Sequence, residues 1–534
     1  MDRRVAQGRS PLASDAPPSS LFVSIAIGSA LVALALVVYT LSHPFRFYDH
    51  FEWQALAFLE GQTAIRYPVE ATATTPGNAF FQDVLPVSTT RGVIPFPPLP
   101  AVVLMPFVAI WGLAADGQLV FAVLGALDVG LAWWVLGRLP VRTWVRAAAT
   151  LFLGFGTVLW YAAQIGTTWY QAHVLAVGLA LAAIGVAIGA DRDAARSEDD
   201  LADERPAASA GAARSAVSNA AAVPAGNRRA GLRLAAVVPD GRQFLAGLLF
   251  GLACTSRLTV AFGAPFFLLV GGGGSWRRRG WSAGLGAGIP LVLLVAYNVA
   301  STGHVFHPGY QHLYELEASF YVPLNYHLDW QIEDLRYLPQ NAAIMFLNTP
   351  VWNPVEVPSA LGLGEPLCVD PAAVRGLFNP ACPLVLPKDT GMSILLTSPA
   401  YLLALGAVRW GFGRSRLVTG AAIAVMIIAV VNLMHFSQGW VQFGYRFSLD
   451  FAPWALLLVA LGFERVAAAA RRLPTRADAG PVAAAGAHPL GVTAASGGVA
   501  RAVAGSAVVL ACLLVVASIL VNFWGVVWGD ALGW

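Results

Sequence analysis

The run LFVSIAIGSALVALALVVYTL at residues 21–41 carries no charged side chain, and the acidic stretch FYDHFEW follows it at 47–53. About 20 apolar residues are enough for an α-helix to cross the hydrocarbon core of a bilayer. No small-residue cleavage site follows the run, so it predicts an uncleaved transmembrane helix and not a signal peptide. The acidic stretch would then lie where lipid meets water.

Apolar runs of the same character recur along the chain. They lie at 98–113, 117–137, 146–163, 169–189, 243–270, 281–300, 391–408, 417–436, 447–464 and 503–528. The composition agrees, because 57% of the residues are hydrophobic and 12% are charged, whereas soluble domains carry about 25% charged residues. We therefore expect an all-α, polytopic bundle in a lipid bilayer, with about 11 membrane segments. The net charge of +3 gives no indication of nucleic-acid binding.

Two of these runs are not typical spans. The run 98–113 follows a Pro-rich approach, contains Pro106 and is short, which favours an interfacial or re-entrant helix. The run 243–270 is interrupted by Thr255-Ser256-Arg257. We expect it to form two half-helices that enter and leave on the same side, with Arg257 at the turn.

The arginines test this interpretation, since short cytoplasmic loops are enriched in basic residues. If 98–113 does not cross and 243–270 is split, every short Arg-rich loop lies on the side of the N-terminus. These loops contain Arg138, Arg142, Arg146, Arg277, Arg278, Arg279, Arg409, Arg414, Arg416, Arg465, Arg471 and Arg472. The predicted protein is then multi-pass in a plasma (inner) membrane. Its N-terminus is cytoplasmic, and its chemistry lies on the extracytoplasmic side.

The chain divides accordingly. Residues 1–20, 190–242 and 468–502 lack an apolar period and are predicted to be disordered cytoplasmic segments. Residues 21–467 form the main transmembrane module, and 503–534 form the last helix. The module carries two external loops, 42–116 with its juxtamembrane helix and 301–390.

The cysteines and the genome-level composition add two smaller points. Cys368 and Cys382 share one external loop, where a disulfide is permitted; two free thiols are the alternative. The abundance of Ala, Gly and Arg beside a single lysine, Lys388, indicates a GC-rich genome and is typical of such bacteria.

Asp49 is the first candidate for chemistry. An acidic side chain at the mouth of a membrane helix is costly and is therefore a candidate for function, here as a general base. The alternative is a helix N-cap, a position that Asp favours. His50 and Glu52 are either partners of Asp49 or solvated loop residues.

Two arginines are the candidates for binding an anion. Arg446, in Gly444–Asp450 (GYRFSLD), stands at the mouth of a late span, and its guanidinium suits a phosphate. The alternative is an ion pair with Asp450 four residues on. Arg257 needs an anionic partner too, either a ligand phosphate or Asp128, which lies in the middle of a span. The supporting residues are expected to be Tyr445, Asp450 and Asp128.

The first half of the 301–390 loop is rich in Tyr, His and Trp. Such side chains suit sugar rings, and an interfacial aromatic belt is the alternative. The His spacings match no standard metal motif, so we expect no metal ion and no cofactor.

Three stretches together resemble the GT-C superfamily of polytopic glycosyltransferases, which use polyprenyl-phosphate sugars as donors. They are Phe47–Gly61 (FYDHFEWQALAFLEG), Pro95–Gly112 (PFPPLPAVVLMPFVAIWG) and Phe443–Pro453 (FGYRFSLDFAP). Many members carry a close acidic pair, such as D-x-D, whereas Asp49 and Glu52 are three residues apart. The role of the second carboxylate therefore stays open.

The resemblance implies a mannosyltransferase-like hexosyl or pentosyl transfer from a polyprenyl-phosphate donor to a lipid, glycan or protein acceptor. Arg257 or Arg446 would stabilise the leaving phosphate. Asp49 would accept the proton of the acceptor hydroxyl, and the anomeric centre would be inverted. The competing readings are a flippase or permease for lipid-linked sugars, a polymerase or ligase of lipid-linked glycans, and a structural scaffold.

Overall fold

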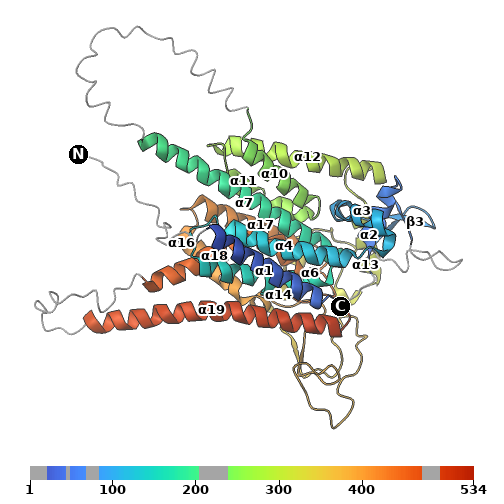
Figure 1. The fold of residues 1–534 in the computed structure, drawn as a ribbon. Coiled ribbons are helices and arrows are strands. Elements are labelled where there is room, and N and C mark those ends of the chain that lie inside the picture. Colours follow the sequence, from blue (N-terminus) through green and yellow to red (C-terminus); the bar gives the residue numbers. More distant parts are fainter. Residues whose placement is uncertain (1–20, 44–47, 68–82, 204–237, 321, 472–492) are drawn as a thin grey trace, which may run out of the picture.

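A computed structural model describes residues 21–43, 48–67, 83–203, 238–320, 322–471 and 493–534. Helices dominate this part of the chain (Figure 1). Seven of them are long and apolar enough to cross a membrane, and the bent pair α5–α6 makes an eighth possible span. The seven are α1 (Leu21–Leu41), α4 (Gly117–Leu136), α7 (Thr168–Asp203), α12 (Trp276–Thr302), α17 (Arg416–Met434), α18 (Ala452–Arg471) and α19 (Thr493–Ala531).

The bundle has a buried centre and a lipid-facing rim. The apolar windows of α18 and α7 are 78% and 72% buried, whereas those of α1, α12 and α19 are each 17% buried. In Figure 1, α12 and α19 accordingly lie along opposite edges of the bundle. A helix with apolar side chains on its exposed side can pack against lipid tails without desolvating polar groups.

Shorter elements complete the bundle. They are α5 (Thr143–Phe155) and α6 (Leu159–Ile165), which meet at 47°, α10 (Gly241–Cys254), η3 (Leu258–Gly263), α11 (Pro265–Leu269), α15 (Ile394–Thr397), η6 (Pro399–Leu403) and α16 (Ala404–Gly411). The expected count of about 11 segments treated several of these as spans. The run 391–408 is not one helix, because Pro399 follows the break at Ser398 and cannot continue α15.

The predicted break in 243–270 is confirmed. α10 ends at Cys254, and the chain turns through Thr255–Arg257 into η3 and α11. The amide of Gln243, in the first turn of α10, donates to the carbonyls of Phe267 (2.8 Å) and Val270 (3.3 Å). η3 and α11 therefore return to the end of the bundle at which α10 begins, and Arg257 lies at the turn inside the bundle.

The remaining elements are short, and the labelled ones within residues 50–111 and 309–320 lie together at one end of the bundle (Figure 1). They are α2 (His50–Leu59), β1 (Ile65–Arg66), β2 (Leu85–Pro86), β3 (Arg91–Val93), α3 (Leu99–Trp111), η2 (Gly112–Ala114), α13 (Gly309–Phe320), η4 (Val322–Leu324), η5 (Leu335–Tyr337), α14 (Leu338–Leu347), β4 (Val351–Trp352), β5 (Val385–Leu386) and η7 (Arg446–Asp450). The first sheet has the antiparallel order β1-β3-β2, and β4 pairs with β5. α3 is shorter than the helices that could span.

Two helices are longer than the sequence analysis allowed. α7 continues to Asp203 and α19 begins at Thr493, so residues 190–203 and 493–502 are helical and not disordered. Residues 190–203 contain neither Gly nor Pro, and extending an existing helix costs far less than nucleating one. The rest of the predicted disordered segments, 1–20, 204–237 and 472–492, lies outside the described residues.

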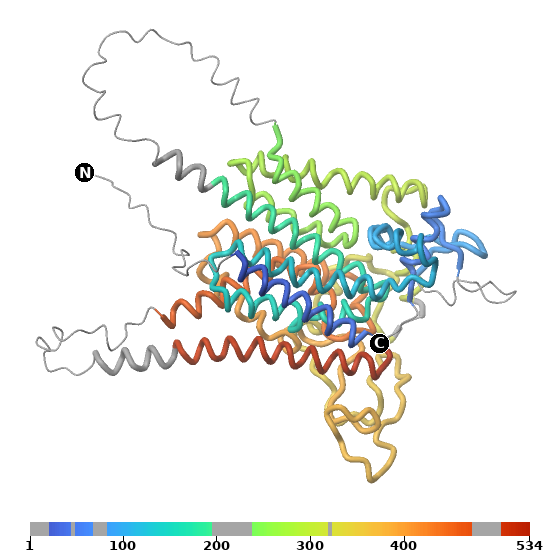
Figure 2. Tube along the Cα trace, viewed as in Figure 1, coloured from blue at the N-terminus to red at the C-terminus, as the bar shows by residue number. Residues whose placement is uncertain are grey.

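The loop 301–390 has an aromatic first half and a cross-linked second half. Rings of Tyr314, Tyr326, Tyr337 and Phe436 are buried together, so they form a small core and not an exposed belt. Cys368 and Cys382 form a disulfide, with 4.4 Å between their Cα atoms. The second half projects from the bundle as the gold segment of Figure 2.

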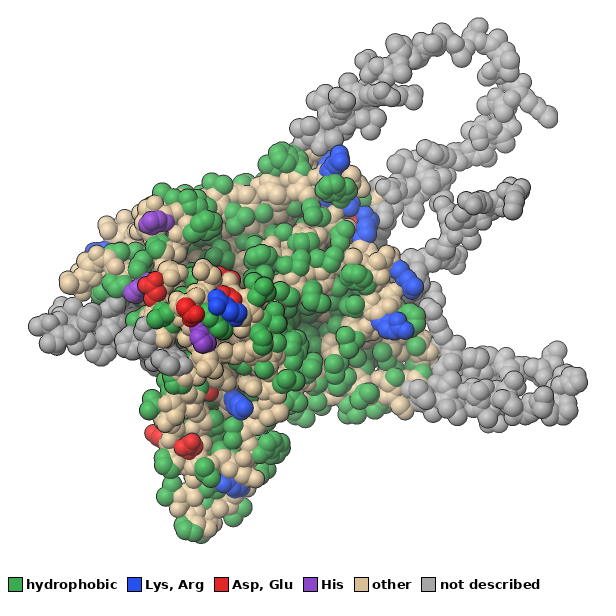
Figure 3. Space-filling model, turned by 180° about the vertical axis from the view of Figure 1, so that it is seen from behind, with side chains coloured by type: hydrophobic (Ala, Val, Ile, Leu, Met, Phe, Trp, Pro, Cys, Tyr) green, Lys and Arg blue, Asp and Glu red, His purple; other side chains and the backbone are tan. Residues whose placement is uncertain are grey.

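Charge separates the two ends of the bundle. Arg146 donates to the hydroxyl of Ser24 near the start of α1 (3.0 Å), and Arg416 contacts Asp191 of α7 (3.3 Å). These arginines therefore lie at the end where α1 begins. Figure 3 shows mainly Lys and Arg among the charged side chains along this end, whereas acidic and His side chains gather at the other end together with further Lys and Arg. The arrangement follows the arginine pattern on which the predicted topology rests.

We expect a cysteine at Thr143 to be labelled only from the cytoplasmic side, because the predicted topology does not count 98–113 as a span. The parent protein is Cys254→Ala/Cys512→Ala, which keeps the disulfide. A membrane-impermeant maleimide should react with Gln62→Cys in intact cells, and with Thr143→Cys only after permeabilisation. Labelling of position 143 in intact cells contradicts the topology.

Candidate functional site

A cavity of about 80 Å³ opens where three segments meet: the break at Thr255–Arg257 between α10 and η3 (the hairpin break), the start of α7, and the segment before α18. Its walls carry two carboxyls, Asp83 and Glu317, and two guanidinium groups, Arg257 and Arg446, together with the imidazole of His435 and the phenol of Tyr310. The lining residues are Asp83, Phe96, Pro97, Thr168, Trp169, Ala172, Ser256, Arg257, Tyr310, Leu313, Glu317, His435, Phe436, Ser437, Arg446 and Phe447. The structure therefore brings together the two arginines that the sequence singled out.

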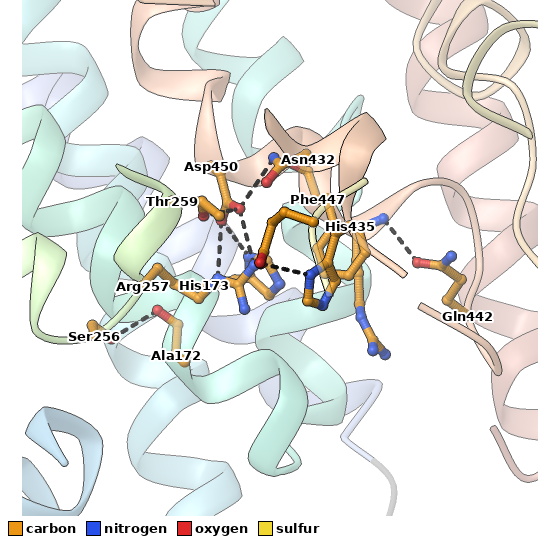
Figure 4. A network of polar contacts seen from close by, with 12 residues as sticks. Ala172, His173, Ser256, Arg257, Thr259, Asn432, His435, Gln442, Phe447 and Asp450 are labelled. Atoms are coloured by element: carbon orange, nitrogen blue, oxygen red, sulfur yellow. Dashed lines mark hydrogen bonds and ion pairs between the residues drawn. The ribbon is translucent and has the colours of Figure 1, made fainter. Parts of the chain in front are cut away.

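Asp450 is the centre of a buried polar network (Figure 4). Its carboxylate, 2% exposed, accepts two hydrogen bonds from Arg257, from Nε at 3.2 Å and Nη2 at 3.0 Å. His173 Nδ1 of α7 lies 2.9 Å from Oδ1. Thr259 Oγ1 (2.6 Å) and Asn432 Nδ2 of α17 (3.2 Å) both donate to Oδ2. A carboxylate can remain charged in such a place because every side of it is hydrogen-bonded.

The alternative considered for Arg446, an ion pair with Asp450, does not occur, since Arg257 is the partner of Asp450. The pairing assumed an α-helix, in which residues four apart share a face. Arg446–Asp450 is instead the 3₁₀ turn η7. With three residues per turn, positions 446 and 450 lie on different faces.

Asp128 is not the partner of Arg257 either. It is buried on α4 against Gly178 of α7, where a Cβ atom would lie only 2.1 Å from Asp128 Oδ1. Asp128 does not line the cavity. Its role as a supporting residue of the site therefore has no basis in the geometry.

Arg446 presents a donor that no described residue satisfies. Its side chain is 9% exposed, and its guanidinium carbon lies 5.5 Å from the ring centres of both Tyr170 and Phe447. Nε has no hydrogen-bond partner among the described residues. Arg257 Cζ lies 5.4 Å from the same Phe447 ring. Two cations thus flank one ring, and of the two only Arg257 is hydrogen-bonded to a carboxylate among the described residues, whereas Arg446 interacts with the charges of Asp83 and Glu317 from a distance.

Two carboxyls of the cavity were not found by the sequence analysis. Asp83 accepts a 2.5 Å hydrogen bond from Trp169 Nε1, and its φ of 64° lies in the left-handed region, which Asp tolerates better than most residues. Burial raises the pKa of Asp83. Burial and the charge of Asp83 raise the pKa of Glu317 to about 8. Neither residue sits in a motif, so no local signal identifies them.

Asp49 lies beside the cavity and does not line it. It is the N-cap residue of α2, but its side chain makes no capping hydrogen bond. Asp49 Oδ1 is buried without a partner among the described residues, and burial raises the Asp49 pKa to about 6. The rings of its neighbours Tyr48 and His50 lie 4.6 Å and 5.9 Å from the ring of Trp169, which forms the cavity wall.

His50 is a positioning residue by geometry. Its ring Nδ1 lies 2.9 Å from Thr168 Oγ1, and its backbone N–H donates to the same hydroxyl (3.2 Å). These contacts hold the start of α2 against the start of α7. Tyr445 is also buried and packs on Phe447, with 5.7 Å between ring centres.

Glu52 points away from the cavity. It is 3% exposed, contacts Gln171 Nε2 at 3.4 Å and fills the space beside Gly117, where a Cβ atom would lie 1.7 Å from Glu52 Oε1. Burial raises its pKa to about 8. Asp49 and Glu52 thus face different surroundings and do not form a pair on one surface.

Nothing in the described part of the chain indicates a metal site, since no group of three or more His, Cys, Asp or Glu side chains there could hold an ion. The polar groups of the cavity instead suit an organic anion beside a hydroxyl. An arginine fork binds phosphate, and a carboxylate with a raised pKa exchanges protons near neutral pH.

No family model and no curated protein matches the chain. Among solved structures, it is similar to ArnT from Cupriavidus metallidurans bound to undecaprenyl phosphate. That likeness has 14% identity and a TM-score of 0.44, and it covers 96% of this chain and 78% of the other. The chain is also similar to the Archaeoglobus fulgidus oligosaccharyltransferase in its apo form, with 11% identity and a TM-score of 0.42, over 96% of this chain and 56% of that one.

Replacing Asp450 by Asn should destabilise the protein strongly. The amide leaves Arg257 buried without a counter-charge, and breaking a buried pair costs about 3–5 kcal/mol. We expect a clear fall in the melting temperature of the purified protein. Asp334→Asn, which removes the partly exposed pair with Arg336, is the control and should change little. Equal melting temperatures for the two variants contradict a central role for Asp450.

Glu52 should make the protein less stable as pH rises. Its pKa is about 8 in the folded state and about 4.5 as a model value, so between these pH values the folded state binds the extra proton. Each pH unit in that window then costs up to about 1.4 kcal/mol. Glu52→Gln should flatten the fall in melting temperature from pH 5.5 to 7.5, and exposed Glu60→Gln should not. An unchanged slope in Glu52→Gln shows that Glu52 is not the titrating group.

Proposed function

We propose that this protein is an integral membrane glycosyltransferase that moves a hexosyl or pentosyl group from a polyprenyl-phosphate donor to an acceptor on the extracytoplasmic face. The observation that carries the proposal is the buried, unsatisfied Nε of Arg446 in a cavity that also holds Arg257 and two carboxyls. The cavity lies at the end of an apolar bundle opposite the arginine-rich end. A ligand that is half lipid and half anion fits this boundary.

Arg446 is the proposed ligand of the donor phosphate. Asp450 already occupies two nitrogens of Arg257, whereas the guanidinium of Arg446 has no such carboxylate partner among the described residues. In a site with little water, an unpaired cation stabilises an anion strongly. The leaving group of the reaction is a phosphate, so its developing charge would be stabilised by Arg446 without a protonated acid.

Asp49 is the proposed general base. Its carboxyl is partly buried, its Oδ1 has no described partner, and a pKa of about 6 leaves it ionised but basic at neutral pH. In the proposed reaction the acceptor hydroxyl attacks the anomeric carbon as Asp49 takes its proton. The bond to the phosphate oxygen breaks on the opposite side, which inverts the anomeric centre.

Asp83 is the competing base, because it lines the cavity and Asp49 does not. Its left-handed backbone and its bond to Trp169 hold the carboxylate in one orientation. The resemblance of Phe47–Gly61 to the first external loop of GT-C enzymes favours Asp49, whereas position in the cavity favours Asp83. The following experiment separates the two.

We expect Asp49→Asn to abolish transfer but to keep donor binding, because the amide keeps the shape and cannot take a proton. Arg446→Lys should weaken donor binding about ten- to a hundredfold, since the loss of a charged hydrogen bond costs roughly 1.5–3 kcal/mol and an ammonium cannot form the bidentate fork. The assay measures the binding of a mannosyl- or arabinosyl-phosphoryl polyprenol to protein in nanodiscs. Transfer of the labelled sugar to acceptors in native membranes is measured alongside.

Two further variants complete the comparison. Arg336→Lys, at a partly exposed pair outside the cavity, should bind donor as the wild type does. If Asp83→Asn abolishes transfer and Asp49→Asn does not, the base is Asp83. If Arg446→Lys leaves donor binding unchanged, the phosphate does not bind at this cavity and the proposed function fails.

A further inference from the structure

A second hollow lies at the base of the projecting loop, away from the cavity. Its volume is about 470 Å³. We call it the loop groove. It is lined by Val351, Trp352, Asn353, Pro354, Val355, Glu356, Pro358, Ser359, Ala360, Lys388, Asp389 and Thr390. None of these residues has a part in the proposed transfer chemistry.

The loop groove has walls that are held in place. Its two sides are joined by the β4–β5 pair, in which Val351 faces Leu386 and Trp352 faces Val385. Arg375 Nη1 donates to the carbonyls of Pro354 (3.0 Å) and Pro383 (2.8 Å). With the disulfide farther along the loop, these contacts give a preformed hollow, which lowers the entropic cost of binding.

Two side chains of the loop groove are unusual for a solvent-facing loop. The indole of Trp352 is 65% exposed. Lys388, the only lysine of the chain, is half-buried and has no ion pair with any described residue, and the lining also carries the carboxylates of Glu356 and Asp389. An exposed aromatic face packs against the C–H face of a sugar ring, as aromatic faces do against other flat apolar surfaces. The Asp389 carboxylate already accepts two hydrogen bonds, from Trp440 Nε1 and the N–H of Ala360, and the ammonium of Lys388 remains available to an anion.

The loop groove is connected directly to the segment that carries Arg446. The carboxylate of Asp389, 6% exposed, accepts hydrogen bonds from Trp440 Nε1 (2.6 Å) and the N–H of Ala360 (2.8 Å). Its carbonyl accepts from the N–H of Gln442 (3.0 Å), and Gln442 Oε1 accepts from the N–H of Arg446 (3.0 Å). A molecule in the groove is therefore held on the same rigid support as the cavity.

We propose that the loop groove binds the acceptor, and that the acceptor is an anionic saccharide. This rests on the proposed function and names its substrate class. Trp352 stacks on a sugar ring, and Lys388 pairs with a carboxylate or phosphate on the saccharide. The groove holds the chain so that its terminal hydroxyl reaches the donor in the cavity.

The test is binding of defined saccharides to the full-length protein in nanodiscs, by calorimetry or saturation-transfer NMR. Hexagalacturonate, with one carboxylate on each ring, is the anionic probe, and maltohexaose is the neutral one. We expect hexagalacturonate to bind at least tenfold more tightly than maltohexaose. The substitutions Trp352→Ala and Lys388→Gln should each weaken its binding at least tenfold.

The control is Phe378→Ala, which removes an exposed ring of the same loop outside the groove and should leave binding unchanged. Melting temperatures and the intact Cys368–Cys382 bond verify that each variant is folded. Three results overturn the proposal: no binding to the wild type, equal binding of the two probes, or binding that neither substitution weakens. Donor binding measured on the same samples reports on the cavity alone, so a failure of the groove is distinguishable from a failure of the proposed function.

Discussion

The buried pair of Arg257 and Asp450 is the interaction on which the functional end of the protein depends. Two charges inside a bundle lose their hydration, and only close and complete hydrogen bonding compensates that loss. The partners come from the hairpin break, α7, α17 and η7, so satisfying the charges joins four segments that are far apart in the sequence. Arg446 and Phe447 belong to η7, the same turn as Asp450, so their position is a consequence of this network.

Neutralising Arg257 has a second effect, because it makes the two arginines unequal. Both lie close to the ring of Phe447, yet Arg257 is paired and Arg446 keeps an unsatisfied Nε. The paired arginine stabilises the structure, and the other is left for a ligand. The carboxyls of Asp83 and Glu317 then limit how much negative charge the cavity accepts. With the Glu317 pKa near 8, this carboxyl stays largely protonated at neutral pH, so a phosphate meets less repulsion.

Hydrogen bonds connect the loop groove to the segment that carries Arg446, although the linings of the groove and the cavity share no residue. Asp389 and Gln442 are nearly inaccessible to solvent, and together they hydrogen-bond the groove floor to the turn before Arg446. In the proposed reaction, a polar acceptor would approach from water and a lipid-linked donor from the bilayer, and the two would need binding sites of opposite character. The bundle end supplies a cavity with two arginines and two carboxyls, and the loop supplies an open site with an aromatic face.

The sequence by itself determined the membrane bundle, the break at Thr255–Arg257 and the arginine-rich end. These features rest on hydropathy, on interrupted apolar runs and on charge. Each is a local property of a segment, and the insertion of that segment into a bilayer depends on it directly. It also singled out Asp49, Arg257 and Arg446, because ionisable side chains at span ends are rare and costly. Only the tertiary structure decided that Asp450 pairs with Arg257 and not with Arg446, that Asp128 and Glu52 lie elsewhere, and that Asp83 and Glu317 enter the cavity. The physical reason is that a buried charge takes its partner from whichever segments pack around it. Contacts between segments that are far apart in the sequence cannot be inferred from the spacing of residues along the chain.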